Sequence, residues 1–264
     1  MDIRTWMLGF LTLITACFLP SKGFADMGRQ AGNWGVVGAS GSGKSTFTSG
    51  LLLEYKARVP NAVIFAPTEE MKQIADYSVF VSAAMQQKGF DPAKLEALYR
   101  AHGWVHFEVP PSPYTKSFVN QALEPLWKIG TFEATKCHAL VVYIEAKNYL
   151  RKNNLPPNSE RLESEGRKFG IDIIKDFQRW QSSGPDALDM AALSQITRRV
   201  VLPMQELNAR KRVLTECAGV RDPALMQRPE NGFGGEMDIL DSLRGKKAEV
   251  RRESDGSRWL WRTN

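Results

Sequence analysis

The sequence predicts an α/β fold with a mostly parallel central sheet flanked by helices. Along most of the chain, short apolar runs alternate with segments in which apolar residues recur at helical spacing, the pattern of parallel strands connected by helices. A glycine-rich stretch near residue 40 joins the first apolar run to the first helical segment. With 264 residues, 43% of them hydrophobic, the chain is long enough for one large core with small additions.

The first apolar run, 34–37, is predicted to be a buried strand, and 47–56 is predicted to be a helix. The residues between and after these runs are Gly38, Ala39, Ser40, Gly41, Ser42, Gly43, Lys44, Ser45 and Thr46. The first eight match G-x-x-x-x-G-K-[ST], the P-loop pattern, in which backbone N–H groups and the start of a helix bind phosphate. We therefore predict ATP and Mg²⁺ as ligands, with Lys44 on the β- and γ-phosphates and Ser45 on Mg²⁺.

The next segments continue the alternation of strands and helices. We expect a strand at 61–66, a helix opening at 67–70 with Thr68 as its N-cap, a helical region at 78–102 broken at 89–92, a strand at 104–109, and a helix at 118–127.

A further apolar run, 138–145, ends in Glu145. This is the pattern of a Walker B strand, in which an acid at the end of a strand holds Mg²⁺ or activates water. Ligands bind at the carboxyl ends of parallel strands, so we expect Glu145 to lie near the nucleotide. A polar loop at 151–159 and a charged helix at 160–168 are expected to follow.

One later strand has an uncertain place in the sheet. Residues 170–178 have strand character, but Asp172, Lys175 and Asp176 interrupt the apolar pattern, which argues against a central, buried position. A short helix is expected at 187–194 and the last core strand at 200–202.

The tail, 244–262, carries seven Lys or Arg and three Asp or Glu residues. Its apolar positions, Val250 and 259–261, are expected to form a terminal hairpin. This hairpin either contacts DNA or a neighbouring subunit, or is a solvated sheet edge. The net charge of +6 suits a polyanionic partner but does not require one.

The three cysteines, Cys17, Cys137 and Cys217, are far apart and lack the spacing of a zinc site. We expect no disulfide and a reducing compartment. Cys137 and His138 stand at the start of a predicted strand and are expected to be buried structural residues.

Three interpretations stay open for the apolar N-terminal segment, 1–26. Translation begins at Met27, the segment anchors a cytoplasmic or virion-associated ATPase to a membrane, or it is a cleaved export signal. The expected organisation is this segment, an ATPase domain at 27–243 and the basic tail at 244–264.

Three later motifs resemble the FtsK/HerA superfamily of DNA-pumping ATPases. Residues 144–150 are similar to its Asp-Glu-Ala-His-Asn segment, 165–171 to its Gly-Arg-Lys-aromatic-Gly-Ile segment, and 178–179 to its Thr-Gln-Arg-Pro segment. The resemblance covers about 34–212. The chain is short, like the genome-packaging ATPases of tailless phages with internal membranes; filamentous-phage assembly ATPases stay open as near relatives.

The resemblance implies a P-loop NTPase of the RecA-like, additional-strand type and a role for several residues. Glu145 would polarise the attacking water and hold Mg²⁺ together with Ser45, and Gln178 would sense the γ-phosphate. Arg167 or Arg179 would reach a neighbouring subunit's nucleotide as an arginine finger; for each, a plain surface arginine is the alternative.

The sequence departs from the family pattern at three positions. Ile144 stands in place of the Walker B aspartate, Lys147 in place of a histidine, and Trp180 in place of a proline. These departures put the catalytic rate in doubt more than the fold, because Glu145 would have to serve both Mg²⁺ and water.

The function implied by the resemblance is ATP-driven translocation of double-stranded DNA by a homo-oligomeric ring. Basic residues such as Arg198, Arg199 and 210–212 would contact the DNA backbone, and capsid or membrane-vertex proteins are further expected partners. The alternative is a membrane-associated nucleotide-binding component of an assembly or export complex with slow turnover. The N-terminal segment and Ile144 favour that alternative.

Overall fold

The computed structural model describes residues 32–129, 137–179, 187–196, 198–202, 248–252 and 259–263. Within these residues, no helix combines the length and the apolar character that a membrane crossing requires. The N-terminal segment 1–26 and the basic run 210–212 lie outside the described residues, so the predictions that depend on them remain predictions.

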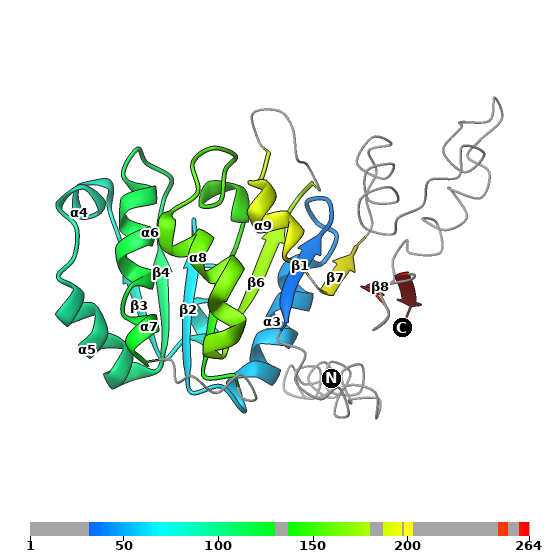
Figure 1. Cartoon of the computed structure of the whole chain (residues 1–264), viewed down its shortest axis with the longest axis horizontal. Coiled ribbons are helices and arrows are strands. Elements are labelled where there is room, and N and C mark those ends of the chain that lie inside the picture. Colours follow the sequence, from blue (N-terminus) through cyan, green and yellow to red (C-terminus); the bar gives the residue numbers. More distant parts are fainter. Residues whose placement is uncertain are drawn as a thin grey trace, which may run out of the picture. The chain divides into compact units, whose positions relative to one another are not determined.

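In the described part of the chain, nine strands form one sheet (Figure 1). From one edge to the other they are β3 (Tyr77–Phe80), β4 (Trp104–Glu108), β2 (Asn61–Ala66), β5 (Ala139–Tyr143), β6 (Ile171–Phe177), β1 (Asn33–Val37), β7 (Arg198–Val201), β8 (Ala248–Arg252) and β9 (Trp259–Thr263). The first seven are parallel, and β8 and β9 are antiparallel. The predicted α/β class and the terminal hairpin are confirmed.

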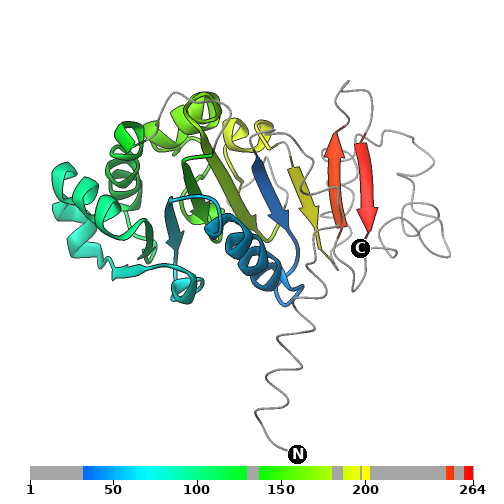
Figure 2. The ribbon, with the colours of Figure 1, turned by 90° about the horizontal axis from the view of Figure 1, so that it is seen from below.

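Helices cover both faces of the sheet (Figures 1 and 2). The described helices are α3 (Lys44–Lys56), α4 (Ala83–Lys88), α5 (Pro92–His102), α6 (Thr115–Leu123), α7 (Leu126–Ile129), α8 (Pro157–Glu165) and α9 (Met190–Ser194), with 3-10 turns η1 (Lys72–Ile74), η2 (Ala146–Asn148) and η3 (Gly166–Phe169). The P-loop helix α3 lies on one face, and α6, α8 and α9 lie on the other.

The strand β6 lies at the centre of the sheet, between β5 and β1, and all seven of its residues are buried. The expectation that this strand does not occupy a central, buried position is therefore wrong. Because β6 separates the P-loop strand β1 from β5, the predicted additional-strand arrangement is confirmed.

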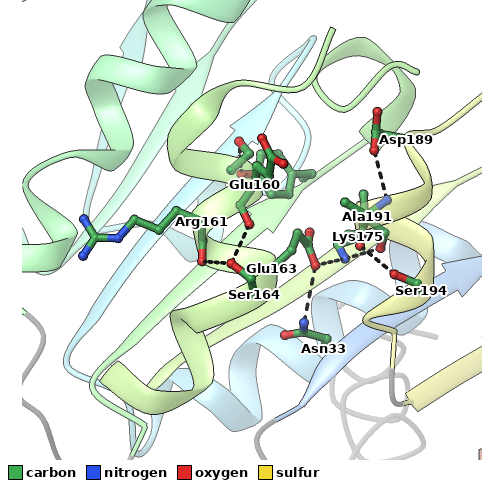
Figure 3. Close-up of polar contacts among 12 residues, drawn as sticks. Asn33, Glu160, Arg161, Glu163, Ser164, Lys175, Asp189, Ala191 and Ser194 are labelled. Carbon is green, nitrogen blue, oxygen red and sulfur yellow. Dashed lines mark hydrogen bonds and ion pairs between the residues drawn. The ribbon is translucent and has the colours of Figure 1, made fainter. Parts of the chain in front are cut away.

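Two charged residues of β6, Asp172 and Lys175, are compatible with burial because each has a partner. Lys175 Nζ donates to Glu163 Oε2 and to the carbonyl oxygen of Ala192, both at 2.6 Å, and Figure 3 shows Glu163 of α8 directed at Lys175. Asp172 Oδ2 accepts from the Tyr55 hydroxyl of α3 at 2.9 Å. Lys175 thus points to the face covered by α8 and α9, and Asp172 points to the α3 face.

Several predicted elements before residue 130 differ from the structure. The helix expected at 67–70 is absent, and Thr68 caps no helix, because the chain turns there and enters η1 after Met71, whose φ is 67°. Residues Tyr77–Phe80 form the strand β3 instead of a helix. The β3 strand is exposed or half-buried along its length; it pairs with β4, and Ser78 Oγ forms a hydrogen bond with His106 Nδ1 at 2.9 Å.

Smaller differences concern element ends and burial. The helix predicted at 118–127 is divided into α6 and α7, and the helix predicted at 160–168 ends at Glu165, where η3 begins. Cys137 and His138 are half-buried, which corrects the expectation that they are buried.

Aromatic rings hold the carboxyl ends of β2, β4 and β5 together. The Phe65 ring has its centroid within 6.3 Å of those of Phe107, Phe118, Tyr143 and Tyr149, and all five side chains are at most 3% exposed. Packing of this kind gives the loops above the strand ends a rigid base, and Glu145 lies in one of these loops.

Candidate nucleotide-binding site

The P-loop connects the end of β1 to the start of α3, as predicted. Gly41 and Gly43 have φ values of 74° and 91°, which side chains disfavour. A Cβ atom at Gly38 would lie 2.5 Å from Ser42 Oγ and 2.8 Å from Leu202 Cβ. The glycines of the motif are therefore required by the turn itself.

The start of α3 is free of competing groups. Gly43 is its N-cap, no side chain caps the helix, and its first turn contains no acidic residue. The first N–H groups of a helix lack partners within the helix and sit at its positive end. An anion such as a phosphate group fits this position.

A cavity of about 360 Å³ opens next to the P-loop. Its lining residues are Ser40, Gly41, Gly43, Lys44, Ser45, Thr46, Glu70, Glu145, Asp176 and Gln178. The structure thus brings four predicted residues from three motifs to one place: Lys44, Ser45, Glu145 and Gln178. Gly38, Ala39 and Ser42 belong to the loop but do not line the cavity.

Two side chains of the P-loop contact groups near the cavity. Lys44 Nζ donates to the carbonyl oxygen of Ala39 at 2.9 Å, so the ammonium group lies over the loop. Ser45 Oγ donates to Glu70 Oε1 at 2.9 Å. Glu70 comes from the turn after β2 and was not predicted as a site residue.

Glu145 is held by two amides at the end of β5. Its Oε2 accepts from Asn148 Nδ2 at 3.2 Å and its Oε1 accepts from Gln178 Nε2 at 3.5 Å. Its backbone is in the left-handed region with φ 51°, which is uncommon outside glycine and often marks functional positions. The half-buried carboxylate therefore has a defined orientation toward the cavity.

Asp176 of β6 is a second site residue that the sequence reasoning missed. Its side chain is 2% exposed and lines the cavity. Burial raises its pKa to about 7, Lys44 opposes this rise, and Glu70 and Glu145 add to it. In the sequence, Asp176 follows a buried apolar run as Glu145 does, but its neighbours Asp172 and Lys175 argue against a buried strand.

The donor set of the cavity fits Mg²⁺. It offers the Ser45 hydroxyl and the carboxylates of Glu70, Glu145 and Asp176, and magnesium prefers hard oxygen ligands. Among the described residues, no three His, Cys, Asp or Glu side chains converge as a self-sufficient metal site. Mg²⁺ in nucleotide sites instead takes one or two protein ligands together with phosphate oxygens and water.

The predicted arginine fingers lie apart from the cavity lining. Arg167 is exposed in η3, which precedes the amino end of β6, whereas the cavity lies at the carboxyl ends of the strands. Arg179 is exposed and directly follows Gln178. A role of either residue toward a neighbouring subunit remains a prediction.

Arg198 does not fit the predicted role in DNA contact. It is 8% exposed, and its guanidinium group stacks over the Trp34 ring with 4.8 Å between Cζ and the ring centroid. The side chain therefore belongs to the packing between β7 and β1, which corrects the expectation.

Comparison with solved structures identifies the fold. The genome packaging NTPase B204 from Sulfolobus turreted icosahedral virus 2, in complex with AMP, superposes with a TM-score of 0.60 at 12% identity, covering 89% of this chain and 98% of that one. The chain has the P-loop NTPase fold. The DNA-packaging ATPase B204 from Sulfolobus turreted icosahedral virus gives a TM-score of 0.57 at 13% identity, covering 89% and 98%.

A third solved structure has a similar fold. VirB4 of Thermoanaerobacter pseudethanolicus gives a TM-score of 0.53 at 13% identity, covering 89% of this chain and 91% of that one. The predicted resemblance to packaging ATPases is confirmed for the fold. Neither the family models nor the curated proteins that were compared with the sequence match it.

Proposed function

We propose that this protein is an ATP hydrolase of the P-loop NTPase class. The observation that carries the proposal is the single cavity in which Lys44, Ser45, Glu145 and Gln178 meet at the carboxyl ends of β1, β5 and β6. The solved structures of similar fold include complexes with AMPPCP, AMP and ATP-gammaS, which supports a nucleotide as the ligand.

Different groups of the site bind the phosphates, activate water and hold Mg²⁺. Backbone N–H groups of the loop and of the first turn of α3 bind the phosphates, and Lys44 neutralises charge on the β- and γ-phosphates. Glu145 accepts a proton from the attacking water, and Gln178 holds the Glu145 carboxylate and senses the γ-phosphate. When bound, Mg²⁺ neutralises charge on the phosphates, with Ser45 and Glu145 as its predicted ligands.

We propose that ATP hydrolysis drives the translocation of double-stranded DNA by a homo-oligomeric ring of this protein, as in viral genome packaging. The fold likeness to packaging NTPases and the resemblance of residues 144–150, 165–171 and 178–179 support this. The protein would contact the DNA backbone and, at a virion, capsid or membrane-vertex proteins.

A specific observation favours a second function. Ile144 fills the position of the Walker B aspartate and is 1% exposed, which suits a protein that binds ATP and hydrolyses it slowly. Such a protein would act as a nucleotide-dependent switch in a membrane-associated assembly or export complex.

ATP hydrolysis by the full chain, measured with and without double-stranded DNA, separates the two functions. The Lys44→Ala variant is the blank, because it removes the cation that binds the phosphates. Turnover that DNA stimulates and that vanishes in the blank supports translocation. Nucleotide binding without DNA-dependent turnover supports the switch, and the absence of nucleotide binding contradicts both.

A further inference from the structure

The end of β5 lacks the aspartate that precedes the glutamate of a Walker B strand. Ile144 takes that place, and its apolar, buried side chain provides no ligand for a cation. Glu145 would then have to hold Mg²⁺ and activate water at once, although both its oxygens already accept hydrogen bonds from Asn148 and Gln178.

The neighbouring strand carries a carboxylate at the same level of the sheet. In the parallel pair of β5 and β6, Tyr143 is the partner of Lys175, so Ile144 and Asp176 are the next residues along the two chains. Residues at matching positions of parallel strands direct their side chains to the same face. Lys175 points toward α8 and α9, and Asp176 therefore points to the α3 face, where the P-loop lies.

Asp176 lies close to the P-loop itself. It pairs in register with Val36 of β1, two residues before the loop begins, and it lines the cavity together with Lys44 and Ser45.

The burial of Asp176 calls for a cation. A carboxylate with 2% exposure is costly unless a positive charge compensates it. Lys44 is the nearby cation, and in a nucleotide complex its charge is directed to the phosphates. A divalent cation between Ser45 and the phosphates would take over the compensation.

We propose that Asp176 supplies the carboxylate that holds Mg²⁺ with Ser45, directly or through a bound water. The carboxylate that a Walker B strand would carry at the end of β5 is then provided by β6. Glu145 is then left to act on the attacking water alone. This inference rests on the proposed function, since it requires a nucleotide in the P-loop.

The test measures metal binding, not turnover. The full chain is titrated with Mn²⁺ in the presence of a non-hydrolysable ATP analogue, and bound Mn²⁺ is followed by electron paramagnetic resonance. Asp176→Asn is expected to lower the Mn²⁺ affinity on the order of 10- to 100-fold, while the analogue still binds in EDTA.

Asp172→Asn is the matched control. Asp172 lies on the same strand and faces the same side, is also buried, and bonds Tyr55 outside the cavity. This variant is expected to keep the Mn²⁺ affinity of the wild type. A folded Asp176→Asn variant with wild-type Mn²⁺ affinity overturns the inference.

A second variant keeps the test decisive if Asp176→Asn does not fold. Ile144→Asp combined with Asp176→Ser returns the carboxylate to β5 and is expected to bind Mn²⁺ within roughly tenfold of the wild type. Asp176→Ser alone is expected to bind Mn²⁺ more weakly than this double variant, and wild-type Mn²⁺ affinity of a folded Asp176→Ser variant overturns the inference. A wild-type chain that binds neither Mn²⁺ nor the analogue when both are present overturns the proposed function as well, so the two failures are distinguishable.

Discussion

At the scale of single residues, the site depends on where carboxylates are placed and what holds them. Glu145 is fixed by a left-handed backbone and by the amides of Asn148 and Gln178. Asp176 is buried, whereas Glu70 is exposed and bonds Ser45. Three acids around one cavity can therefore serve different purposes, because their surroundings differ.

We expect Glu145→Gln to bind ATP like the wild type and to lose turnover by about 10²- to 10⁴-fold, the usual contribution of a general base. The amide keeps the shape of the side chain but cannot take a proton from water. Steady-state hydrolysis and the binding of a fluorescent ATP analogue check both parts. Wild-type turnover would contradict the role of Glu145.

Asn148→Ala is expected to lower kcat roughly tenfold, the cost of one hydrogen bond to a charged group. The change removes a donor that orients Glu145 without touching the P-loop, so KM should stay the same. Asn158→Ala, whose side chain bonds the Asn120 carbonyl oxygen away from the cavity, is the control. An unchanged kcat in Asn148→Ala would show that Gln178 alone orients the carboxylate.

At the scale of elements, β6 combines two roles that act on opposite faces. Asp176, and Gln178 directly after the end of the strand, line the cavity on the α3 side. Lys175 forms hydrogen bonds with residues of α8 and α9 on the other side. Burial raises the pKa of Glu163 to about 7, and Lys175 opposes this rise. The Glu163–Lys175 pair, with side chains 2% and 0% exposed, is a sensitive point of the fold.

Lys175→Met is expected to destabilise the protein by about 3–5 kcal/mol, because it leaves the buried Glu163 without its cation. The double variant Glu163→Leu/Lys175→Met should recover most of this loss, since no buried charge remains. Urea unfolding of both variants measures the difference. Equal destabilisation by the single and the double variant would contradict the argument and indicate that packing dominates.

At the scale of the whole molecule, the proposed ring requires contacts between subunits. Arg167 is exposed and lies at the opposite end of β6 from the cavity of its own chain. Such a side chain can act on a nucleotide only if it belongs to a neighbouring subunit. This geometry makes the role of Arg167 testable by mixing variants.

Arg167→Ala and Glu145→Gln are each expected to be inactive, and mixing the two is expected to restore part of the turnover. In a mixed ring, some cavities combine an intact Glu145 from one subunit with an intact Arg167 from the next. The same mixture with Arg179→Ala tests the other candidate. Turnover of Arg167→Ala alone at the wild-type rate would leave Arg167 a surface residue.

The sequence by itself determined the fold class, the P-loop, and the expectation that Glu145 lies near the P-loop. These features depend on local patterns: glycines that a turn requires, apolar runs of strand length, and an acid at the end of such a run. Motifs 100 residues apart were expected to meet because parallel strands end at one edge of the sheet.

The tertiary structure alone decided the central place of β6, the existence of β3, and the positions of Asp176 and Glu70. Burial of Asp172 and Lys175 depends on partners far away in the sequence, Tyr55 and Glu163, which no local pattern announces. The β3 strand pairs with β4, and its side-chain contacts with His102 and His106 come from other elements of the chain. A charged residue in a strand sequence argues against burial unless the folded chain supplies its partner, and the burial of Asp176 beside the P-loop therefore becomes evident only in the tertiary structure.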